Sequence, residues 1–194
     1  MAEFSDIITS KVRIKVIELF LSNTKEIYHV RGIVREISEE INAVRRELER
    51  LEKAGFFKKE GRGNRVYYIL RDDYPFFGDL LSITAKTTGL GKEIIEGRSK
   101  IGKVSLVMFS GRFVRRKDRK REDSIDVLLV GDVVLPELAA LIRKEESKRG
   151  KEINYTVMSR DELDFRKKRR DPFLLEILSG SRVMIIGDEE DLVG

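Results

Sequence analysis

The sequence predicts an α+β protein, and two observations support this prediction. The first part of the chain shows helix-period apolar patterns followed by two β-prone runs, whereas the last part alternates short apolar strands with helical segments. A chain of 194 residues is long enough for one or two domains. We expect an N-terminal domain at 1–74, connector helices at 75–98 that are able to form a dimer contact, and an α/β domain with a mixed sheet at 99–194.

The composition limits the classes of function. The absence of cysteine excludes disulfides and thiolate metal sites, and a single histidine, His29, excludes a histidine-based metal cluster within one chain. We therefore expect no metal site. The net charge of +5 fits a nucleic-acid partner without identifying one. No apolar run approaches the roughly 20 residues of a membrane span, and the start has no apolar core of signal-peptide length, so we expect a cytoplasmic protein without a membrane partner.

Three helices and a hairpin are expected in the N-terminal domain. The first helix covers 5–21 with Ser5 as N-cap, and the second covers 26–37, led by an extended piece at 26–28. The third covers 39–54, with Ser38 as N-cap and Gly55 at the position after its end. The runs 56–60 and 65–70 flank a tip rich in glycine and asparagine, which is typical of a hairpin. This order of elements predicts a winged helix-turn-helix.

The third helix holds the expected DNA-reading residues. Its apolar stripe is Ile41, Val44, Leu48 and Leu51, and its polar side presents Asn42, Arg45, Arg46 and Arg50. Arginine can donate two hydrogen bonds to guanine, and asparagine can pair twice with adenine in the major groove. At the hairpin tip, Arg62, Asn64 and Arg65 are placed to meet phosphates or the minor groove.

The segments EIYHVRGIVREI, INAVRRELERLEKAGFFKKE and GNRVYYIL resemble the winged-helix domains of ArsR-type transcriptional regulators, over about residues 5–72. The resemblance implies a homodimer that binds double-stranded DNA at a two-fold symmetric site. The cysteine and histidine ligands of metal-sensing members are missing here. We interpret His29 as a capping or packing residue.

In the C-terminal domain, strands are expected at 104–109, 125–131, 153–157 and 182–186, with helices at 135–148, 161–167 and 172–179. The segments KVSLVMFSGRF, DSIDVLLVGD and DPFLLEILSGSRVMIIGD resemble the minimal nucleotidyltransferase domain, over roughly residues 99–190. The resemblance implies a Gly-Ser pair at a helix start that holds a triphosphate. It also implies two strand carboxylates, one residue apart, that hold Mg²⁺.

The sequence departs from that pattern at each position. The chain has Ser110-Gly111 in reversed order, only Asp126 in register, and Asn154 where a third carboxylate could stand. Asp123 points to the opposite face unless a bulge re-aims it. We expect no catalysis, and therefore neither Mg²⁺ nor a nucleoside triphosphate as cofactor. The alternative is an active Mg²⁺-dependent nucleotidyltransferase that modifies a protein or RNA, with Asp126 as its catalytic residue.

Two basic runs lie in this domain. Residues 112–121 contain seven basic side chains and one acid, Asp118. The basic loop comprises Arg115, Arg116, Lys117, Arg119, Lys120 and Arg121, after Arg112. A solvated loop and an electrostatic contact with DNA, RNA or a nucleotide both fit it, and the run at 166–170 is open to the same two interpretations. The expected function is a sequence-specific, DNA-binding transcriptional regulator. A partner-binding module without a ligand is a further alternative.

Overall fold

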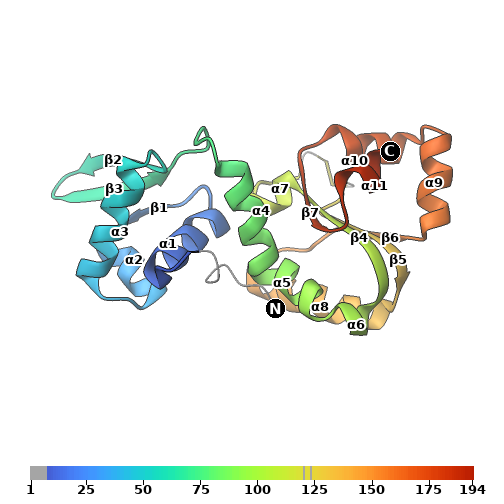
Figure 1. The fold of residues 1–194 in the computed structure, drawn as a ribbon, viewed down its shortest axis with the longest axis horizontal. Coiled ribbons are helices and arrows are strands. Elements are labelled where there is room, and N and C mark those ends of the chain that lie inside the picture. Colours follow the sequence, from blue (N-terminus) through green and yellow to red (C-terminus); the bar gives the residue numbers. More distant parts are fainter. Residues whose placement is uncertain (1–7, 120, 123) are drawn as a thin grey trace. The chain divides into compact units, whose positions relative to one another are not determined.

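The chain is α+β, with one three-stranded and one four-stranded sheet in the described residues (Figure 1). This confirms the expected fold class. The computed structural model describes residues 8–119, 121–122 and 124–194. The chain divides into two compact units, Met1–Thr87 and Thr88–Gly194, and each has its own core.

The first unit combines helices with a three-stranded antiparallel sheet in the order β1-β3-β2. Its elements in chain order are α1 (Lys11–Ser22), β1 (Ile27–His29), α2 (Val30–Ile37), α3 (Ile41–Lys53), β2 (Phe57–Arg62), β3 (Arg65–Leu70) and α4 (Phe77–Thr87). The expected hairpin is therefore present, and the extended piece before α2 adds a third strand that pairs with β3.

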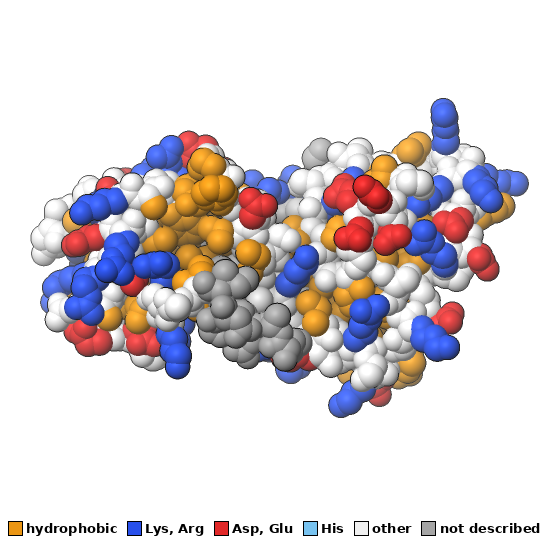
Figure 2. Space-filling view, in the orientation of Figure 1, with side chains coloured by type: hydrophobic (Ala, Val, Ile, Leu, Met, Phe, Trp, Pro, Cys, Tyr) orange, Lys and Arg blue, Asp and Glu red, His pale blue; other side chains and the backbone are white. Residues whose placement is uncertain are grey.

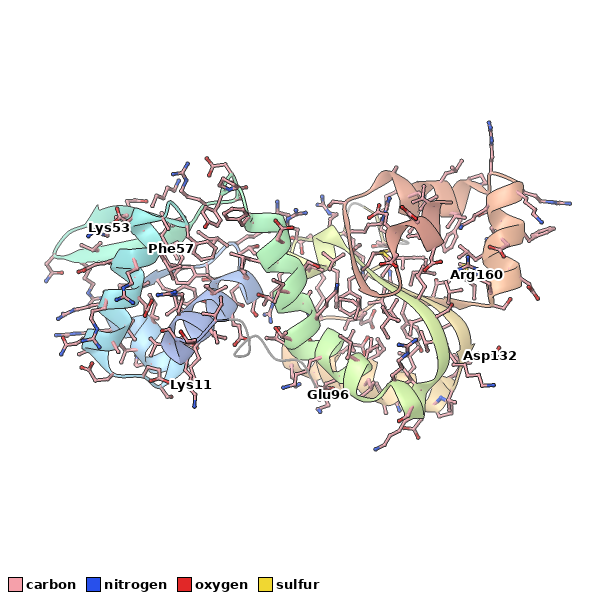
Figure 3. All side chains as sticks on the ribbon, viewed as in Figure 1. Lys11, Lys53, Phe57, Glu96, Asp132 and Arg160 are labelled. Atoms are coloured by element: carbon pink, nitrogen blue, oxygen red, sulfur yellow. The ribbon has the colours of Figure 1, made fainter. Side chains whose placement is uncertain are left out.

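The core of the first unit forms where α1, α3 and the sheet meet. Val44 and Leu48 of α3 are fully buried, as the apolar stripe predicts. Phe20 of α1 is also fully buried, and its ring centroid lies 4.3 Å from that of Phe57, which comes from β2 (Figure 3). Burial of a side chain of this kind stabilises a fold by about 1.5–3 kcal/mol. This core fixes which side of α3 faces inward.

Two helix starts differ from the expectation. Residues 8–10 are not helical, and α1 begins at Lys11 because the Ser10 hydroxyl accepts a hydrogen bond from the Arg13 amide. The expected N-cap Ser5 lies outside the described residues. For α3, Glu40 rather than Ser38 is the N-cap, because Ser38 adopts a left-handed conformation with φ of 53° at the end of α2.

The end of α3 agrees with the sequence. The Phe56 amide donates to the Leu51 carbonyl and the Gly55 amide donates to the Glu52 carbonyl, at 2.9 Å each. Gly55 has a φ of 83°, which residues with a Cβ rarely adopt. These two bonds form a Schellman motif. The chain thus leaves α3 sharply and enters the hairpin.

The second unit contains a mixed four-stranded sheet in the order β6-β5-β4-β7, with only β5 and β6 parallel. Its helices are α5 (Gly89–Glu96), α6 (Arg98–Ile101), α7 (Gly111–Val114), α8 (Leu135–Arg149), α9 (Arg160–Lys168), α10 (Pro172–Ser179) and α11 (Glu189–Val193). Its strands are β4 (Gly102–Ser110), β5 (Val127–Val133), β6 (Tyr155–Met158) and β7 (Arg182–Ile186). The expectation of a mixed sheet is confirmed.

Strand β5 is the centre of this second core. Its residues 127–130 are all fully buried, so both of its faces are covered. Leu128 and Val130 pack with Leu163 of α9, Leu174 of α10 and Leu192 of α11. Strands β5 and β6 begin two residues later than expected, so that Asp126 and Asn154 lie just before them. Asp126 and Asn154 are nevertheless hydrogen-bonded to each other, because the Asp126 amide donates to the Asn154 carbonyl at 2.8 Å.

The segment 75–98, expected as one connector, is divided between the units at Thr87 and Thr88. Helix α4 packs against α1, and α5 packs against α8. Thr88 alone separates the two helices, because α4 ends at Thr87 and α5 begins at Gly89, whose φ is 52°.

The Glu47 carboxylate joins α3 to α1, and its removal is expected to destabilise the first unit. Its side chain is 9% exposed and accepts bonds from Arg13 Nε at 2.8 Å and Ser10 Oγ at 2.9 Å. Glu47→Ala should lower the free energy of unfolding by about 1.5–3 kcal/mol, the usual value for a hydrogen bond to a charged group. Urea unfolding followed by circular dichroism measures this loss. Glu49→Ala, which removes an exposed carboxylate from the same helix, is the control.

The pH dependence gives an independent check. Burial raises the pKa of Glu47, but the hydrogen bonds from Arg13 and Ser10 outweigh burial and hold the pKa below its ordinary value of 4.5. The resulting stabilisation is present above pH 4.5 and is lost as the pH falls through the lower folded-state pKa. Wild type should therefore lose more stability than Glu47→Ala on acidification. Equal losses in the two proteins would show that the contact contributes nothing.

Candidate functional site

The outward face of α3 presents the residues expected to read DNA. Asn42, Arg45 and Arg46 are exposed, and their side chains make no hydrogen bond or ion pair with the part of the chain that the structure describes. Residues three and four apart on a helix share a face, so Asn42 lies beside both arginines. Figure 2 shows Lys and Arg side chains gathered over the helices of this unit. This face can donate several hydrogen bonds to an external acceptor.

Arg50 was expected on the same face but has a partner inside the protein. Its guanidinium Nη1 lies 3.3 Å from Glu47 Oε1, although the side chain is 64% exposed. Because Glu47 is held by Arg13 and Ser10 as well, Arg50 belongs to the contact between α1 and α3. We therefore expect Arg50 to contribute less to the binding of an external ligand than Arg45 or Arg46.

The start of α3 is fixed by Glu40. Its Oε2 accepts hydrogen bonds from the Asn42 and Ala43 amides, at 2.9 Å each. These two bonds lower the pKa of Glu40, burial opposes them, and the charges of Arg46 and Arg45 lower the pKa further. The carboxylate thus satisfies two amides that would otherwise lack a partner at the helix start and sets where Asn42 emerges.

At the tip of the hairpin, the side chain of Arg62 has partners within the protein, whereas those of Asn64 and Arg65 have none among the described residues. A two-residue connection, Gly63 and Asn64, joins β2 to β3, and Gly63 has the positive φ of 61° that such tight turns need. Arg62 Nε donates to Glu60 Oε1 at 2.8 Å, and its guanidinium lies 5.5 Å from the Tyr67 ring centroid. Asn64 and Arg65 are exposed, and neither side chain has a partner among the described residues.

His29 is a capping residue, as expected. Its Nδ1 accepts a hydrogen bond from the Gly32 amide at 3.0 Å at the start of α2. Its ring meets Tyr67 edge to face at 5.6 Å. These contacts give His29 a structural role in joining β1, α2 and β3.

In the second unit, the expected basic loop is largely anchored. Arg112 Nε donates to the Asp118 carbonyl at 2.6 Å, and Arg115 Nη1 donates to Ser181 Oγ at 3.1 Å. Arg116 and Arg121 also have interactions within the protein, whereas Lys117 is exposed. Lys120 lies outside the described residues. The interpretation of a flexible, solvated loop therefore does not hold for the anchored arginines.

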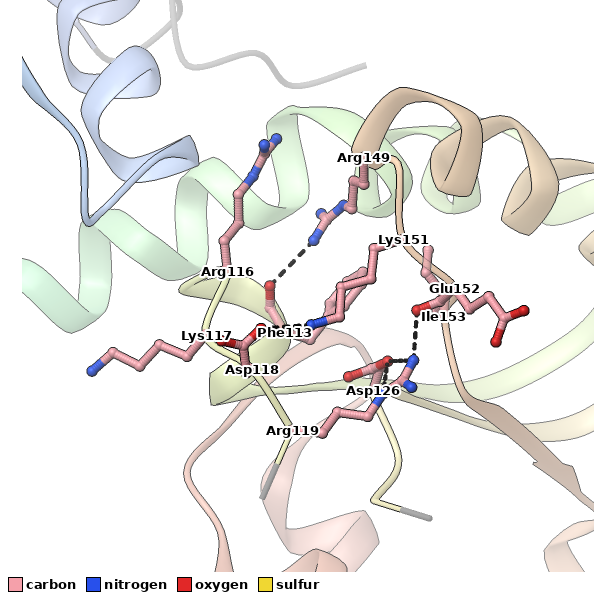
Figure 4. Close-up of a pocket in the computed structure, with 10 residues that line it drawn as sticks. All are labelled: Phe113, Arg116, Lys117, Asp118, Arg119, Asp126, Arg149, Lys151, Glu152 and Ile153. Atoms are coloured by element: carbon pink, nitrogen blue, oxygen red, sulfur yellow. Dashed lines mark hydrogen bonds and ion pairs between the residues drawn. The ribbon is translucent and has the colours of Figure 1, made fainter. Parts of the chain in front are cut away.

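Arg119 of this loop pairs with Asp126. Its Nη2 lies 2.8 Å from Asp126 Oδ2 and donates to the Glu152 carbonyl, and its Nε donates to the same carboxylate oxygen at 2.9 Å (Figure 4). The Asn154 amide donates to Asp126 Oδ2 at 3.1 Å. Asp126, with its side chain 9% exposed, is thereby neutralised within the protein. Arg119 occupies the position beside Asp126 that a metal ion would need.

The other positions of the nucleotidyltransferase pattern also serve internal contacts. The Asn154 side-chain amide donates to the Glu122 carbonyl at 2.6 Å and the Ser124 carbonyl at 3.3 Å. Asp123 lies outside the described residues. Among the described residues, no group of three or more histidine, cysteine, aspartate or glutamate side chains could hold a metal ion. The described residues therefore do not fit the Mg²⁺ site that the resemblance implies.

The Gly111 and Phe113 amides at the start of α7 have hydrogen-bond acceptors within the protein. The Gly111 amide donates to the Ser181 carbonyl at 2.6 Å, and the Phe113 amide donates to Ser110 Oγ at 3.2 Å. A Cβ on Gly111 would clash with Ser181 Oγ. Gly111 is thus required by the approach of Ser181, and the amides that would bind a triphosphate in the resembled family already have acceptors.

Two pockets adjoin the Arg119–Asp126 pair. One, of about 180 Å³, is lined by Phe113, Lys117, Arg149 and Lys151 among others (Figure 4). Lys151 pairs with Asp118 at 2.7 Å and the Arg149 guanidinium lies 4.0 Å from the Phe113 ring centroid, whereas the Lys117 side chain has no partner among the described residues. The other pocket, of about 360 Å³, is lined by four serines together with apolar side chains, including Met108 and Phe173. Neither pocket concentrates unpaired charge of one sign.

No family model, no curated protein and no solved structure matches this chain. Function therefore has to be inferred from the contacts themselves. No helix of the described residues is both long and apolar enough to span a membrane.

The role of Arg119 was not predicted from the sequence, although the exposed positions of Asn42, Arg45, Arg46, Asn64 and Arg65 were. The signal was present in the sequence, because an arginine stands seven residues before the isolated Asp126. The sequence alone did not show which of the loop's many cations would turn inward.

Arg119→Ala should destabilise the second unit, because it leaves the Asp126 carboxylate without its cation. The expected cost is about 3 kcal/mol, as for a buried pair that loses one partner. Amide hydrogen exchange in β5 and β6 measures it. Arg119→Ala combined with Asp126→Ala should cost less than the sum of the single substitutions. Lys117→Ala, which removes an exposed cation of the same loop, is the control, and equal exchange in both variants would contradict the assigned role of the pair.

Proposed function

We propose that this chain is a sequence-specific transcriptional regulator that binds double-stranded DNA through α3. The outward face of α3 supports this proposal best, since Asn42, Arg45 and Arg46 are exposed there without partners among the described residues. The opposite face of α3 is held by the contacts of Glu47. Arg45 and Arg46 can therefore bind base edges, and no internal contact has to break. The proposal includes the cytoplasmic location expected from the sequence.

The order of elements in the first unit agrees with a winged helix-turn-helix. Helices α2 and α3 are separated by Ser38, Glu39 and Glu40, and the β2–β3 hairpin follows α3 directly. In such domains the second helix of the pair enters the major groove, and its N-terminal residues contact base edges. Asn42, Arg45 and Arg46 all belong to the first half of α3.

The hairpin supplies the expected backbone contact. Arg65 is exposed at the tip without a described partner, whereas Arg62 is already held by Glu60. Contacts to phosphates position a protein on the duplex and raise its affinity, but they do not select sequence. We therefore assign sequence selection to α3 and phosphate contact to the hairpin, with Arg65 ahead of Arg62.

The proposal also includes a homodimer on a two-fold symmetric site, as the resemblance to ArsR-type regulators implies. Phe76, just before α4, is 60% exposed in the chain and is a candidate for burial in such a dimer. Analytical ultracentrifugation of the full chain tests this part separately.

For the second unit, we propose a nucleotidyltransferase-like domain that no longer transfers nucleotides. The support is the use of its motif positions in internal contacts: Asp126 with Arg119, Gly111 with Ser181, and Asn154 with the Glu122 and Ser124 carbonyls. Calorimetry with Mg²⁺ and a nucleoside triphosphate tests this part, and tight binding would contradict it.

Binding selection on a random duplex library, at two salt concentrations, tests the main proposal. Wild type should enrich a defined sequence, whereas Arg45→Ala and Arg46→Ala should each lose about 1–3 kcal/mol of discrimination at particular base pairs. Lys25→Ala is the matched control. It removes an exposed cation beside β1, whose Ile27 pairs with Ile69 at the end of the sheet remote from the hairpin tip.

The control variant should select the same sequence as wild type. No enrichment by wild type at low salt would overturn the proposal. A specificity profile that is unchanged in both arginine variants would overturn the assignment to α3.

Salt dependence separates the hairpin from the helix. Arg65→Ala should weaken binding equally across sequences and reduce the slope of log affinity against log salt by about 0.9, as for one lost phosphate contact. Arg62→Ala should change the slope less, because Glu60 already neutralises Arg62. Fluorescence anisotropy with the selected duplex measures both slopes, and an unchanged slope in Arg65→Ala would remove the hairpin from the interface.

A further inference from the structure

Helix α9 exposes an aromatic side chain beside several cations. Phe165 is 55% exposed, and Lys168 and Arg169 share its face of the helix because they lie three and four residues further on. The Arg169 guanidinium lies 4.7 Å from the Phe165 ring centroid. Figure 2 shows Lys and Arg side chains gathered at the right-hand edge of the view, where α9 lies in Figure 1.

These cations have few internal partners. The side chains of Lys168 and Arg170 are exposed and make no hydrogen bond or ion pair within residues 8–119, 121–122 and 124–194, and the Arg169 side chain makes only its ring contact there. Arg170 has a φ of 51°, so the backbone turns away just after the helix. The end of α9 therefore presents three adjacent cations to solvent beside an aromatic ring.

The helix that holds this group is firmly anchored. Leu163 is fully buried in the core of the second unit. On the same helix, Arg166 pairs with Glu162 at 2.8 Å and with Asp171 at 3.2 Å, and Lys167 Nζ donates to two backbone carbonyls of residues 191 and 194. The remaining cations of the basic run at 166–170 are thus used to fix α9, and the exposed group stands on a rigid support.

Helix stability alone does not account for this group. Cations near the C-terminus of a helix interact favourably with its dipole, which explains Lys168 and Arg169. The dipole gives no reason for a phenylalanine that stays more than half in water. An exposed ring with a guanidinium on it and unpaired ammonium and guanidinium groups nearby matches the way proteins hold unpaired bases, by stacking and by phosphate contact.

We propose that Phe165 and Arg169 form a stacking platform for single-stranded nucleic acid, with Lys168 and Arg170 contacting its phosphates. Inside a duplex both faces of each base are covered by its neighbours, so along a strand only unpaired bases are free to stack on Phe165. This site lies in the second unit and goes beyond the proposed reading of duplex DNA by α3.

The test uses the full chain with Arg45→Ala and Arg46→Ala as background, so that duplex reading by α3 does not contribute. Fluorescence anisotropy with labelled twelve-nucleotide single-stranded DNA and RNA, at two salt concentrations, measures binding. Phe165→Ala should weaken binding about tenfold at both concentrations, as for the loss of one stacked base. Lys168→Ala with Arg170→Ala should instead reduce the salt slope by about 1.4, since each phosphate contact with a single strand contributes about 0.7.

Two further variants make the result specific. Leu135→Ala removes an apolar side chain of the second unit that is 55% exposed and lies outside α9, and it should leave oligonucleotide affinity unchanged. Phe165→Trp should retain affinity, and because the chain has no tryptophan, its fluorescence reports the site alone. Quenching of that fluorescence by added oligonucleotide shows base stacking on the ring.

Several outcomes would overturn the platform. The first is the absence of oligonucleotide binding at low salt. The second is equal affinity of Phe165→Ala and its background protein, and the third is a tryptophan whose fluorescence is not quenched in the bound state. A duplex that binds the background protein as tightly as the single strands, with the same loss in Phe165→Ala, would overturn the preference for single strands. Each outcome is independent of the duplex selection, so the platform and the regulator can fail separately.

Discussion

The orientation of α3 is the constraint on which the functional account depends. Val44 and Leu48 are buried in the core, and Glu47 is held by Arg13 and Ser10 of the α1 region, so the opposite face has to point outward. Asn42, Arg45 and Arg46 stand on that face. A buried carboxylate with two donors from another element tolerates little rotation of the helix, because a turn of one residue would remove Glu47 from its partners and expose apolar surface.

The second unit also contains a buried carboxylate that is paired with an arginine. Where Glu47 orients a helix, Arg119 pairs with Asp126, the carboxylate that the sequence analysis considered as a metal ligand. Ser181 fills the approach to Gly111 in the same way. Polar groups that could serve a ligand at these two positions already have partners in the protein, whereas the end of α9 presents exposed cations without a partner among the described residues.

The sequence predicted the elements with strong periodicity and missed those decided by distant contacts. The stripe of α3, the glycine at its end and the hairpin were predictable, because spacing and glycine chemistry are local. The N-cap was not, since Ser38 adopts a left-handed conformation and Glu40 reaches the amides instead. Likewise, the outward-facing arginines of α3 were found from their helix face, whereas the inward turn of Arg119 depends on Asp126 and Glu152, which the sequence pattern alone does not place.

The most direct test of the central claim is an NMR titration that follows the arginine side-chain Nε–H signals as duplex DNA is added. If α3 enters the groove with its outward face, the signals of Arg45 and Arg46 shift, while that of Arg13, held by Glu47 behind the helix, stays in place. If the Arg45 and Arg46 signals remain unchanged while other arginines shift, α3 is not the reading element and the account is wrong.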